Sequence, residues 1–356
     1  MSELELFGRF PQTRTLARVE LGQFPTPVAP LERLGSEFGI PNLFVKRDDL
    51  SGTLYGGNKV RKLEFLLGDA KAQGYDKVWT VGAIGSHHVL ATSIYAREIG
   101  LQPAALHFPQ PITAHVLDVL KALSTTQPEL TLVGHMAQVP MAMAKIRIKE
   151  WLARHPDVYY IPGGGSSLVG VLGYVNAALE LKHQVDQGEL PEPDVIFVGA
   201  GTCGTLSGLI LGCHLAGMKS RVIGVRVVDK VIANAHTAAT LANRCGHVLE
   251  QLGVKDIPKI RRQDVTILDN YIGPGYGEPT AEGARYERLV MDLEDLELDP
   301  TYTAKAFAAI IGERARLDLA HKSVLYWHTL SSADLNDRVR GAQVEWDLPP
   351  EYQHFF

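Results

Sequence analysis

The chain has 356 residues, of which 46% are hydrophobic and 21% are charged. This composition is ordinary for a soluble globular enzyme, and the length allows a large core and two domains. The formal net charge of -5 argues against nucleic acid or an anionic membrane as a partner, because both require a strongly basic surface.

The N-terminus and the cysteines predict a cytoplasmic location. The first six residues are acidic where a signal peptide is basic, and no apolar segment follows them. The three cysteines form no C-x-x-C pair and cannot all pair in disulfides, which is typical of a reduced protein. No apolar run is long enough to span a bilayer.

Strand-like runs alternate with helix-like patterns along most of the chain. Residues 43–49 are predicted to form a strand that runs into a turn. Further predicted strands span residues 77–81, 104–108, 130–133, 158–161, 195–198, 222–228, 265–268 and 324–327. The predicted helices include residues 86–99, 141–153, 168–183, 205–216, 280–293 and 303–316. This alternation predicts an α/β fold with parallel sheets covered by helices on both faces.

The domain division is predicted from the absence of a linker. No long stretch rich in proline, glycine and serine separates two halves, so we expect the chain to cross between domains more than once. The predicted division places residues 1–59 and 171–356 in a large cofactor-binding domain. Residues 60–170 then form a small α/β domain.

A single lysine stands at the start of a predicted helix, directly after Gly56, Gly57 and Asn58. The two glycines let the backbone turn sharply next to a bulky ligand. Beyond Lys59, apolar residues at helical spacing are expected to bury one face of the helix. A lysine amine in a dry pocket can lose its proton and form a Schiff base with an aldehyde cofactor. The ordinary alternative is a solvated surface lysine.

A glycine-rich loop follows the predicted strand 195–198. Gly199, Gly201 and Gly204 satisfy G-x-G-x-x-G between a strand and a helix, as in dinucleotide-binding enzymes. An NAD-dependent dehydrogenase is therefore one open interpretation. The other is a monophosphate site, in which the hydroxyls of Thr202 and Thr205 join the backbone N–H groups at the helix N-terminus.

Two further loops deliver polar side chains, and no metal site is predicted. Ser86 begins the predicted helix 86–99, where a serine also serves as an ordinary N-cap. The loop 273–280, rich in glycine and proline, presents Tyr276. His87 and His88 are adjacent and do not share a helix face, and no H-E-x-x-H sequence occurs.

With these features together, the chain resembles the fold type II pyridoxal phosphate enzymes. The resemblance is to the family of 1-aminocyclopropane-1-carboxylate deaminase and D-cysteine desulfhydrase, and it runs from about residue 25 to residue 329. Its most specific strings are Val-Lys-Arg-Asp-Asp at 45–49 and Gly-Gly-Asn-Lys-Val-Arg-Lys-Leu-Glu at 56–64. It implies two parallel-sheet α/β domains of the tryptophan synthase β-like type, pyridoxal 5'-phosphate as cofactor, and a homodimer.

The resemblance also implies roles for individual residues. Lys59 is expected to carry the cofactor as a Schiff base. Ser86 and His87 are expected to face the cofactor and the substrate, and Tyr276 and Tyr302 match the two active-site tyrosines in position. The expected phosphate cup consists of Gly201, Thr202, Cys203, Gly204 and Thr205.

Two positions near the pyridine nitrogen separate the branches of the family. The cyclopropane deaminases resemble one another in having Glu after the second tyrosine and Leu after the last strand's histidine, whereas this chain has Thr303 and Thr329. Neutral hydroxyls leave the ring a weaker electron sink than a carboxylate does. This favours the desulfhydrase branch, a carbon–sulfur lyase that converts D-cysteine to pyruvate, ammonia and sulfide.

The chain departs from the family pattern at two places near the cofactor. His87 replaces the usual asparagine, which hydrogen-bonds the phenolic oxygen of the cofactor, and Leu330-Ser331 replaces the usual Gly-Gly. A 1-aminocyclopropane-1-carboxylate deaminase and a lyase for cysteate or a similar β-substituted amino acid therefore stay open as alternatives. Outside catalysis, a pyridoxal phosphate carrier would use Lys59 and the phosphate cup but not Ser86 and the tyrosines.

Overall fold

The computed structural model describes residues 3–152, 158–340 and 348–356. By its internal contacts the chain divides into two compact units. The larger unit consists of Met1–Leu16, Gly22–Lys62 and Ser166–Ser332. The smaller unit consists of Ala17–Leu21, Leu63–Gly165 and Ala333–Phe356.

This division differs in detail from the expected one, which assigned 60–170 to the small domain. The short segment Ala17–Leu21 and the C-terminal segment Ala333–Phe356 belong to the smaller unit. The expectation that the chain crosses more than once between its two parts agrees with this arrangement. The domain boundaries of the folded protein stay a prediction.

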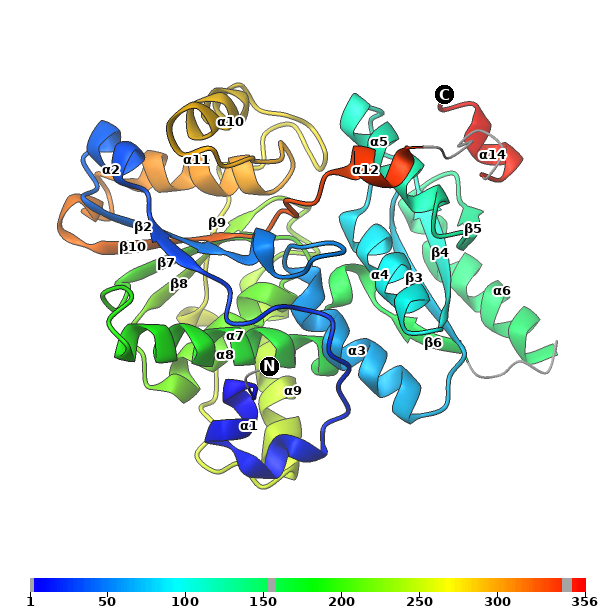
Figure 1. Cartoon of the computed structure of the whole chain (residues 1–356), viewed down its shortest axis with the longest axis horizontal. Helices are drawn as coiled ribbons and strands as arrows, with labels where there is room; N and C mark the ends of the chain where they lie inside the picture. The colour runs from blue at the N-terminus through cyan, green and yellow to red at the C-terminus, as the bar shows by residue number, and fades with distance from the viewer. Residues whose placement is uncertain (1–2, 153–157, 341–347) are drawn as a thin grey trace. The chain divides into compact units, whose positions relative to one another are not determined.

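The larger unit is built on a six-stranded sheet in the order β1-β2-β10-β7-β8-β9 (Figure 1). All neighbouring strands run parallel except β1, which pairs antiparallel with β2 at one edge. The strands are β1 (Val28–Pro30), β2 (Asn42–Arg47), β7 (Val195–Ala200), β8 (Arg221–Arg226), β9 (Thr266–Leu268) and β10 (Ser323–His328). Only β1 was absent from the expected strands, because three residues ending in proline carry no alternating pattern.

Helices cover both faces of this sheet, as the alternating pattern predicted. The helices of the unit are α1 (Glu5–Arg9), α2 (Glu32–Phe38), the start of α3 (Lys59–Ala72), α7 (Leu168–Asp186), α8 (Gly204–Ala216), α9 (Ala235–Gln251), α10 (Ala281–Glu294) and α11 (Thr303–Glu313). In Figure 1, α10 and α11 lie on one side of the sheet, and α7 and α8 lie on the other. A buried apolar cluster joins α2, α10 and α11 to the strands, with Phe197, Phe307 and Tyr326 among its members.

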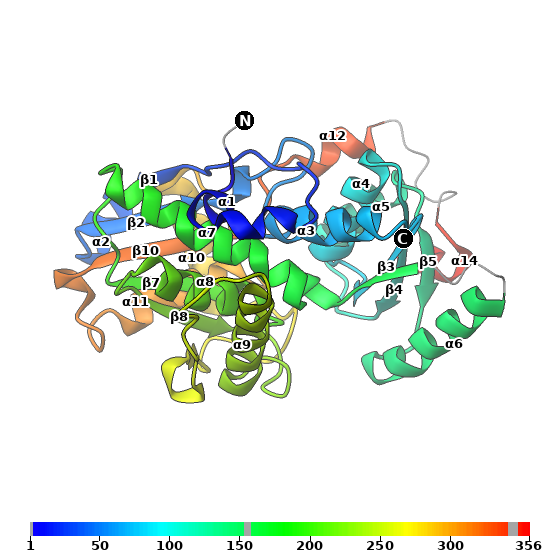
Figure 2. The same ribbon diagram turned by 90° about the horizontal axis from the view of Figure 1, so that it is seen from below.

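The short N-terminal helix α1 is held against α7 (Figure 2). Its buried residue Leu6 donates a backbone hydrogen bond to Asn176 Oδ1 at 3.0 Å.

The smaller unit contains a parallel four-stranded sheet in the order β5-β4-β3-β6. Its strands are β3 (Lys77–Ala83), β4 (Gln102–Phe108), β5 (Glu129–Leu132) and β6 (Val158–Ile161). Its helices are the rest of α3, α4 (His87–Glu98), α5 (Ala114–Ser124), α6 (Val139–Leu152), α12 (Leu335–Val339) and α14 (Pro350–Gln353). Trp79 points to the α6 side of the sheet, and Thr80, the next residue, contacts His88 of α4 on the opposite side.

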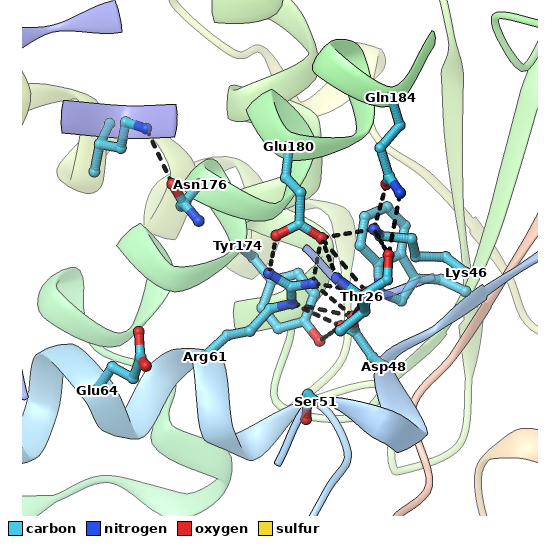
Figure 3. A network of polar contacts seen from close by, with 12 residues as sticks. Thr26, Lys46, Asp48, Ser51, Arg61, Glu64, Tyr174, Asn176, Glu180 and Gln184 are labelled. Carbon is cyan, nitrogen blue, oxygen red and sulfur yellow. Dashed lines mark hydrogen bonds and ion pairs between the residues drawn. The ribbon is translucent and has the colours of Figure 1, made fainter. Parts of the chain in front are cut away.

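A buried network of charged side chains ties together four elements of the larger unit (Figure 3). Arg61 of α3 bonds both carboxylates of the network, Asp48 at 2.8 Å and Glu180 of α7 at 2.8 Å. Lys46 of β2 contacts Glu180 at 2.6 Å, and Trp327 of β10 donates its indole N–H to Asp48 at 2.8 Å. Two positive and two negative charges are thus paired out of water, which offsets the cost of burying each one.

The charges in this network keep Glu180 ionised. Burial by itself raises the pKa of Glu180, but Arg61 and Lys46 lower it to about 2. A carboxylate with a depressed pKa stabilises the fold above its unfolded pKa, and that contribution is lost as the pH falls from the ordinary glutamate pKa of 4.5 through about 2.

We predict that Glu180→Gln lowers the free energy of unfolding by about 3–5 kcal/mol, because it leaves buried cations without their partner. Urea unfolding at neutral pH measures this loss, and the variant should lose less stability than wild type between pH 4.5 and 2. The matched control is Asp186→Asn on the same helix, where the exposed pair with Lys182 contributes less than about 1 kcal/mol. Equal stability of the two variants would contradict a supporting role for the network.

Candidate active site

Lys59 is the first residue of α3 and is placed there by a turn that only glycine can form. A Cβ on Gly56 would lie 1.9 Å from the Asp49 carbonyl oxygen, and one on Gly57 would lie 2.8 Å from the Thr329 carbonyl oxygen. Gly57 also has a φ of 83°, in the left-handed region. The sharp turn that the two glycines predicted is therefore present, packed closely against the backbone of Asp49 and Thr329.

The amine of Lys59 lies partly buried within the larger unit. Its Nζ donates a hydrogen bond to Asn58 Oδ1 at 2.5 Å. Desolvation lowers the pKa of Lys59 to about 8, although the negative charge of Asp299 acts in the opposite direction. Roughly a tenth of the amine is thus neutral and nucleophilic at pH 7, far more than for a lysine with the ordinary pKa of about 10.4.

The glycine-rich loop between β7 and α8 lies next to the residue before Lys59. Asn58 donates its side-chain N–H to Thr205 Oγ1 at 3.1 Å. Cys203 precedes α8 with a φ of 65°, and Gly204 is the first residue of the helix. Burial raises the pKa of the Cys203 thiol to about 11, so the thiol stays protonated at neutral pH.

Ser166, which lies just before α7, also contacts this loop. Its Oγ lies 2.6 Å from Thr202 Oγ1 and accepts the Gly204 backbone N–H at 3.1 Å. A Cβ on Gly204 would lie 2.4 Å from the same oxygen, so this position requires glycine. The N-cap of α7 is the neighbour Ser167, which accepts the Gly170 N–H at 3.1 Å.

Lys62 is a second buried lysine beside the loop that sequence reasoning did not assign to the site. A Cβ added to Gly204 would lie 3.1 Å from Lys62 Nζ, so this amine is next to the start of α8. Desolvation, followed by the positive charge of Lys59, lowers the pKa of Lys62 well below its ordinary value. The spacing of three residues from Lys59 was the available signal, because i and i+3 share one face of a helix.

The two predicted tyrosines lie together. Tyr276 and Tyr302 place their hydroxyl oxygens 3.0 Å apart, with the rings edge to face. The Tyr302 ring also lies against Gly201, where an added Cβ would be 3.4 Å from its Cε1. Burial raises the pKa of both phenols, so both stay neutral and keep a proton to donate.

Asp299 organises the start of α11 and is a further residue that sequence reasoning missed. Its carboxylate accepts the backbone N–H groups of Thr301, Tyr302 and Thr303 at 2.9, 2.7 and 3.1 Å. It also accepts the Thr303 hydroxyl at 2.6 Å. Thr303 is buried, whereas Thr329 is half-buried after β10 and accepts the Asn58 N–H through its carbonyl at 3.2 Å.

Ser86 and His87 belong to the smaller unit. Ser86 is the N-cap of α4, and its Oγ accepts the Val89 N–H at 3.3 Å. His87 is the first residue of α4 and contacts His115 of α5 through their Nε2 atoms at 2.8 Å. The larger unit thus brings together Lys59, the loop 201–205, the tyrosine pair and the two threonine positions.

No group of three or more histidine, cysteine, aspartate or glutamate residues suited to a metal occurs within residues 3–152, 158–340 and 348–356. In the same residues, no helix combines the length and hydropathy needed to span a membrane.

Comparison with known proteins supports the family. A model of the "pyridoxal-phosphate dependent enzyme" family matches residues 19–329. The chain belongs to this family. D-cysteine desulfhydrase of Klebsiella pneumoniae is 35% identical over 317 residues, covering 86% of this chain and 90% of the relative. A Thermotoga maritima protein, provisionally named a 1-aminocyclopropane-1-carboxylate deaminase, is 34% identical over 315 residues, covering 88% and 95%.

Solved structures support the same fold. The crystal structure of an ACC deaminase homologue has a TM-score of 0.77 and 32% identity, covering 93% of this chain and 95% of that one. A threonine deaminase from Solanum lycopersicum has a TM-score of 0.59 at 14% identity, covering 96% and 90%, which shows similarity of fold alone. The predicted fold type II pyridoxal phosphate fold and its family are confirmed. The NAD-dependent dehydrogenase interpretation of the glycine loop is thereby superseded.

The residues of the larger unit fit pyridoxal 5'-phosphate, the cofactor of this family of lyases. Lys59 offers an amine with a lowered pKa, and the start of α8 offers backbone N–H groups beside two buried or half-buried lysines. Such an arrangement favours a phosphate, because a helix N-terminus and cations both stabilise negative charge.

We predict that the Lys59 amine of the cofactor-free protein titrates near pH 8, because its charged form is desolvated. Competitive labelling with an acylating reagent, followed by mass spectrometry, should show modification that rises with pH and levels off above about 8. Exposed Lys255 provides the internal reference for reagent concentration. A midpoint near the unperturbed lysine value of about 10.4 would contradict the desolvated environment.

Proposed function

We propose that this chain catalyses α,β-elimination from D-cysteine or a similar β-substituted amino acid. The products are pyruvate, ammonia and, from D-cysteine, hydrogen sulfide. Membership in a family of pyridoxal phosphate-dependent lyases supports the reaction class. The observation that favours a carbon–sulfur bond is the pair of neutral hydroxyl residues Thr303 and Thr329, where the resemblance implies contact with the pyridine nitrogen.

Lys59 is the residue we assign to the cofactor and to proton transfer. When bound, pyridoxal phosphate supplies an electron sink that stabilises negative charge at the substrate α-carbon. A neutral Lys59 amine can then take the α-proton, and its lowered pKa keeps enough of it unprotonated at physiological pH. Lys46 is a poor alternative because its amine is held in the buried ion pair with Glu180.

The loop 201–205 is the part of the chain we assign to the phosphate. Its backbone N–H groups and the N-terminal end of α8 supply donors, and the hydroxyls of Thr202 and Thr205 add two more. Those hydroxyls already contact Ser166 and Asn58, which orients them within the loop. We assign the neutral phenols of Tyr276 and Tyr302 to the substrate as proton donors, because the Tyr302 ring lies against Gly201 of this loop and its hydroxyl contacts that of Tyr276.

Ser86 and His87 are assigned to the substrate side by the family resemblance. Ser86 Oγ serves as the N-cap of α4, which fixes the side chain at the first turn of that helix. The choice of substrate depends on Thr303, whose hydroxyl brings no charge of its own. The nearby carboxylate of Asp299 is already satisfied by three backbone N–H groups and by Thr303 itself.

We predict that Lys59→Ala abolishes turnover and the visible absorbance of protein-bound cofactor. Borohydride treatment of the wild-type holoenzyme should fix the cofactor on the peptide that contains Lys59, as peptide mass mapping can establish. Reduced cofactor on Lys46 or Lys62 would overturn the assignment, and Lys71→Met, at an exposed lysine of the same helix, serves as the matched control.

The branch assignment is tested by paired kinetics on D-cysteine and 1-aminocyclopropane-1-carboxylate. We expect the wild type to eliminate sulfide faster than it opens the cyclopropane, because a weaker electron sink suffices for a good leaving group. The Thr303→Glu, Thr329→Leu double variant should lose at least about tenfold in D-cysteine turnover, equivalent to about 1.4 kcal/mol of transition-state stabilisation. A wild type that prefers the cyclopropane substrate would assign the chain to the deaminase branch instead.

A further inference from the structure

The carboxylate of Asp299 has all of its hydrogen-bonding capacity in use. Its Oδ1 accepts the backbone N–H groups of Thr301 and Tyr302 at 2.9 and 2.7 Å. Its Oδ2 accepts the backbone N–H of Thr303 at 3.1 Å and the Thr303 hydroxyl at 2.6 Å. A carboxylate offers about four lone-pair positions, and these four hydrogen bonds occupy them. A further donor therefore finds no open position on this buried carboxylate.

The hydroxyl of Thr303 has a direction that its neighbours fix. Its single proton is donated to Asp299, whose Oδ2 lies at 2.6 Å and whose backbone carbonyl oxygen lies at 3.3 Å. Its oxygen accepts the backbone N–H of Asp299 at 2.6 Å. A hydroxyl has one proton to donate and two lone pairs, so one lone pair is left. Buried Thr303 can therefore offer a ligand an acceptor and no donor.

Thr303 is connected to both groups that we assign to the cofactor. It is the first residue of α11 and directly follows Tyr302, whose ring lies against Gly201 of the phosphate loop. The negative charge of Asp299 also reaches the amine of Lys59, where it opposes the effect of desolvation on the pKa. The carboxylate and the hydroxyl thus belong to the same part of the larger unit as the amine and the loop.

We propose that Asp299 sets the protonation state of the ring nitrogen of the cofactor through the hydroxyl of Thr303. This rests on the proposed function, in which Thr303 contacts that nitrogen. An unprotonated ring nitrogen would face the hydroxyl lone pair to lone pair, whereas a protonated nitrogen donates a hydrogen bond to it. The bound cofactor therefore carries a proton on its ring nitrogen. Asp299 is a positioning residue, because it acts on the cofactor only by orienting Thr303.

This Asp299–Thr303 relay gives the chain an electron sink although position 303 has no carboxylate. A protonated ring withdraws electrons more strongly than a neutral ring. The hydrogen bond from the ring ends on a neutral oxygen, which is a weaker acceptor than the carboxylate of a glutamate. The ring is then a sink of intermediate strength, weaker than in the cyclopropane deaminases and stronger than beside a hydroxyl that donates to the nitrogen.

Nitrogen NMR of the holoenzyme tests the relay without turnover. The probe is pyridoxal 5'-phosphate that carries a heavy nitrogen isotope in its ring. The reference is the same cofactor joined to a simple amine in water, at a slightly alkaline pH where its ring nitrogen is unprotonated. We expect the wild-type signal at the chemical shift of a protonated pyridine nitrogen. A wild-type signal at the unprotonated position would overturn the proposal.

Two variants should move the signal to the unprotonated position. Thr303→Val removes the hydroxyl that accepts the hydrogen bond. Asp299→Asn places an amide donor against the hydroxyl, which turns the hydroxyl proton toward the ring, and provides a second test if the first variant folds poorly. A protonated signal that survives in both variants would also refute the relay.

Two further variants separate the relay from a general structural effect. Thr303→Ser keeps the hydroxyl and should keep the protonated signal. Thr301→Val is the matched control in the same turn, because it retains the backbone N–H that Asp299 accepts, and its signal should equal that of wild type. Loss of the protonated signal in Thr301→Val as well as in Thr303→Val would assign the effect to the turn and not to the hydroxyl.

Pyruvate release from D-cysteine separates this proposal from the proposed function. A protonated ring nitrogen that is lost in Thr303→Val, in a protein that releases no pyruvate from D-cysteine, would refute the elimination reaction and leave the relay standing. Pyruvate release by a wild type whose ring nitrogen is unprotonated would refute the relay alone.

Discussion

Pairing of Arg61 with Asp48 and Glu180 is the interaction on which the larger unit depends. These three side chains come from α3, from the segment after β2 and from α7, and no single element could neutralise them. Because an unpaired charge in this position would be very costly, the network determines where the first turn of α3 lies relative to β2 and α7. Lys59 lies two residues before Arg61 in the same helical turn, so the contacts of Arg61 also fix the backbone position of Lys59.

The electrostatics of the candidate site follow from two opposing influences. Lys59 and Lys62 lose hydration next to a helix N-terminus, which lowers the pKa of both amines and leaves the region suited to an anion. Asp299 supplies the opposite charge from the start of α11, and its hydrogen bonds to backbone N–H groups keep it in place. The balance sets the pKa of the Lys59 amine at about 8. At this pKa one residue can serve both as a nucleophile and as a base.

Replacing one side chain changes the chemistry available at the start of α4. An asparagine amide offers a fixed donor and acceptor, whereas His87 contacts His115 of α5 through their Nε2 atoms at 2.8 Å. The N-cap of α4 is Ser86, whose Oγ accepts the Val89 N–H, so this cap does not use the side chain of residue 87. Substrate preference within one family can therefore shift through residues that leave the fold and the cofactor site as they are.

Local features of this protein were readable from the sequence by itself. The predicted strands and helices are present because side-chain periodicity is a property of the nearest few residues. The turn before Lys59 was predicted from two adjacent glycines, because other residues would not fit such a sharp, closely packed turn. The contacts of Lys62, Ser166, Asp299 and His115 were decided only by the tertiary structure. Each contact depends on which elements pack side by side. Sheet order and helix packing decide this, and no local sequence pattern encodes them.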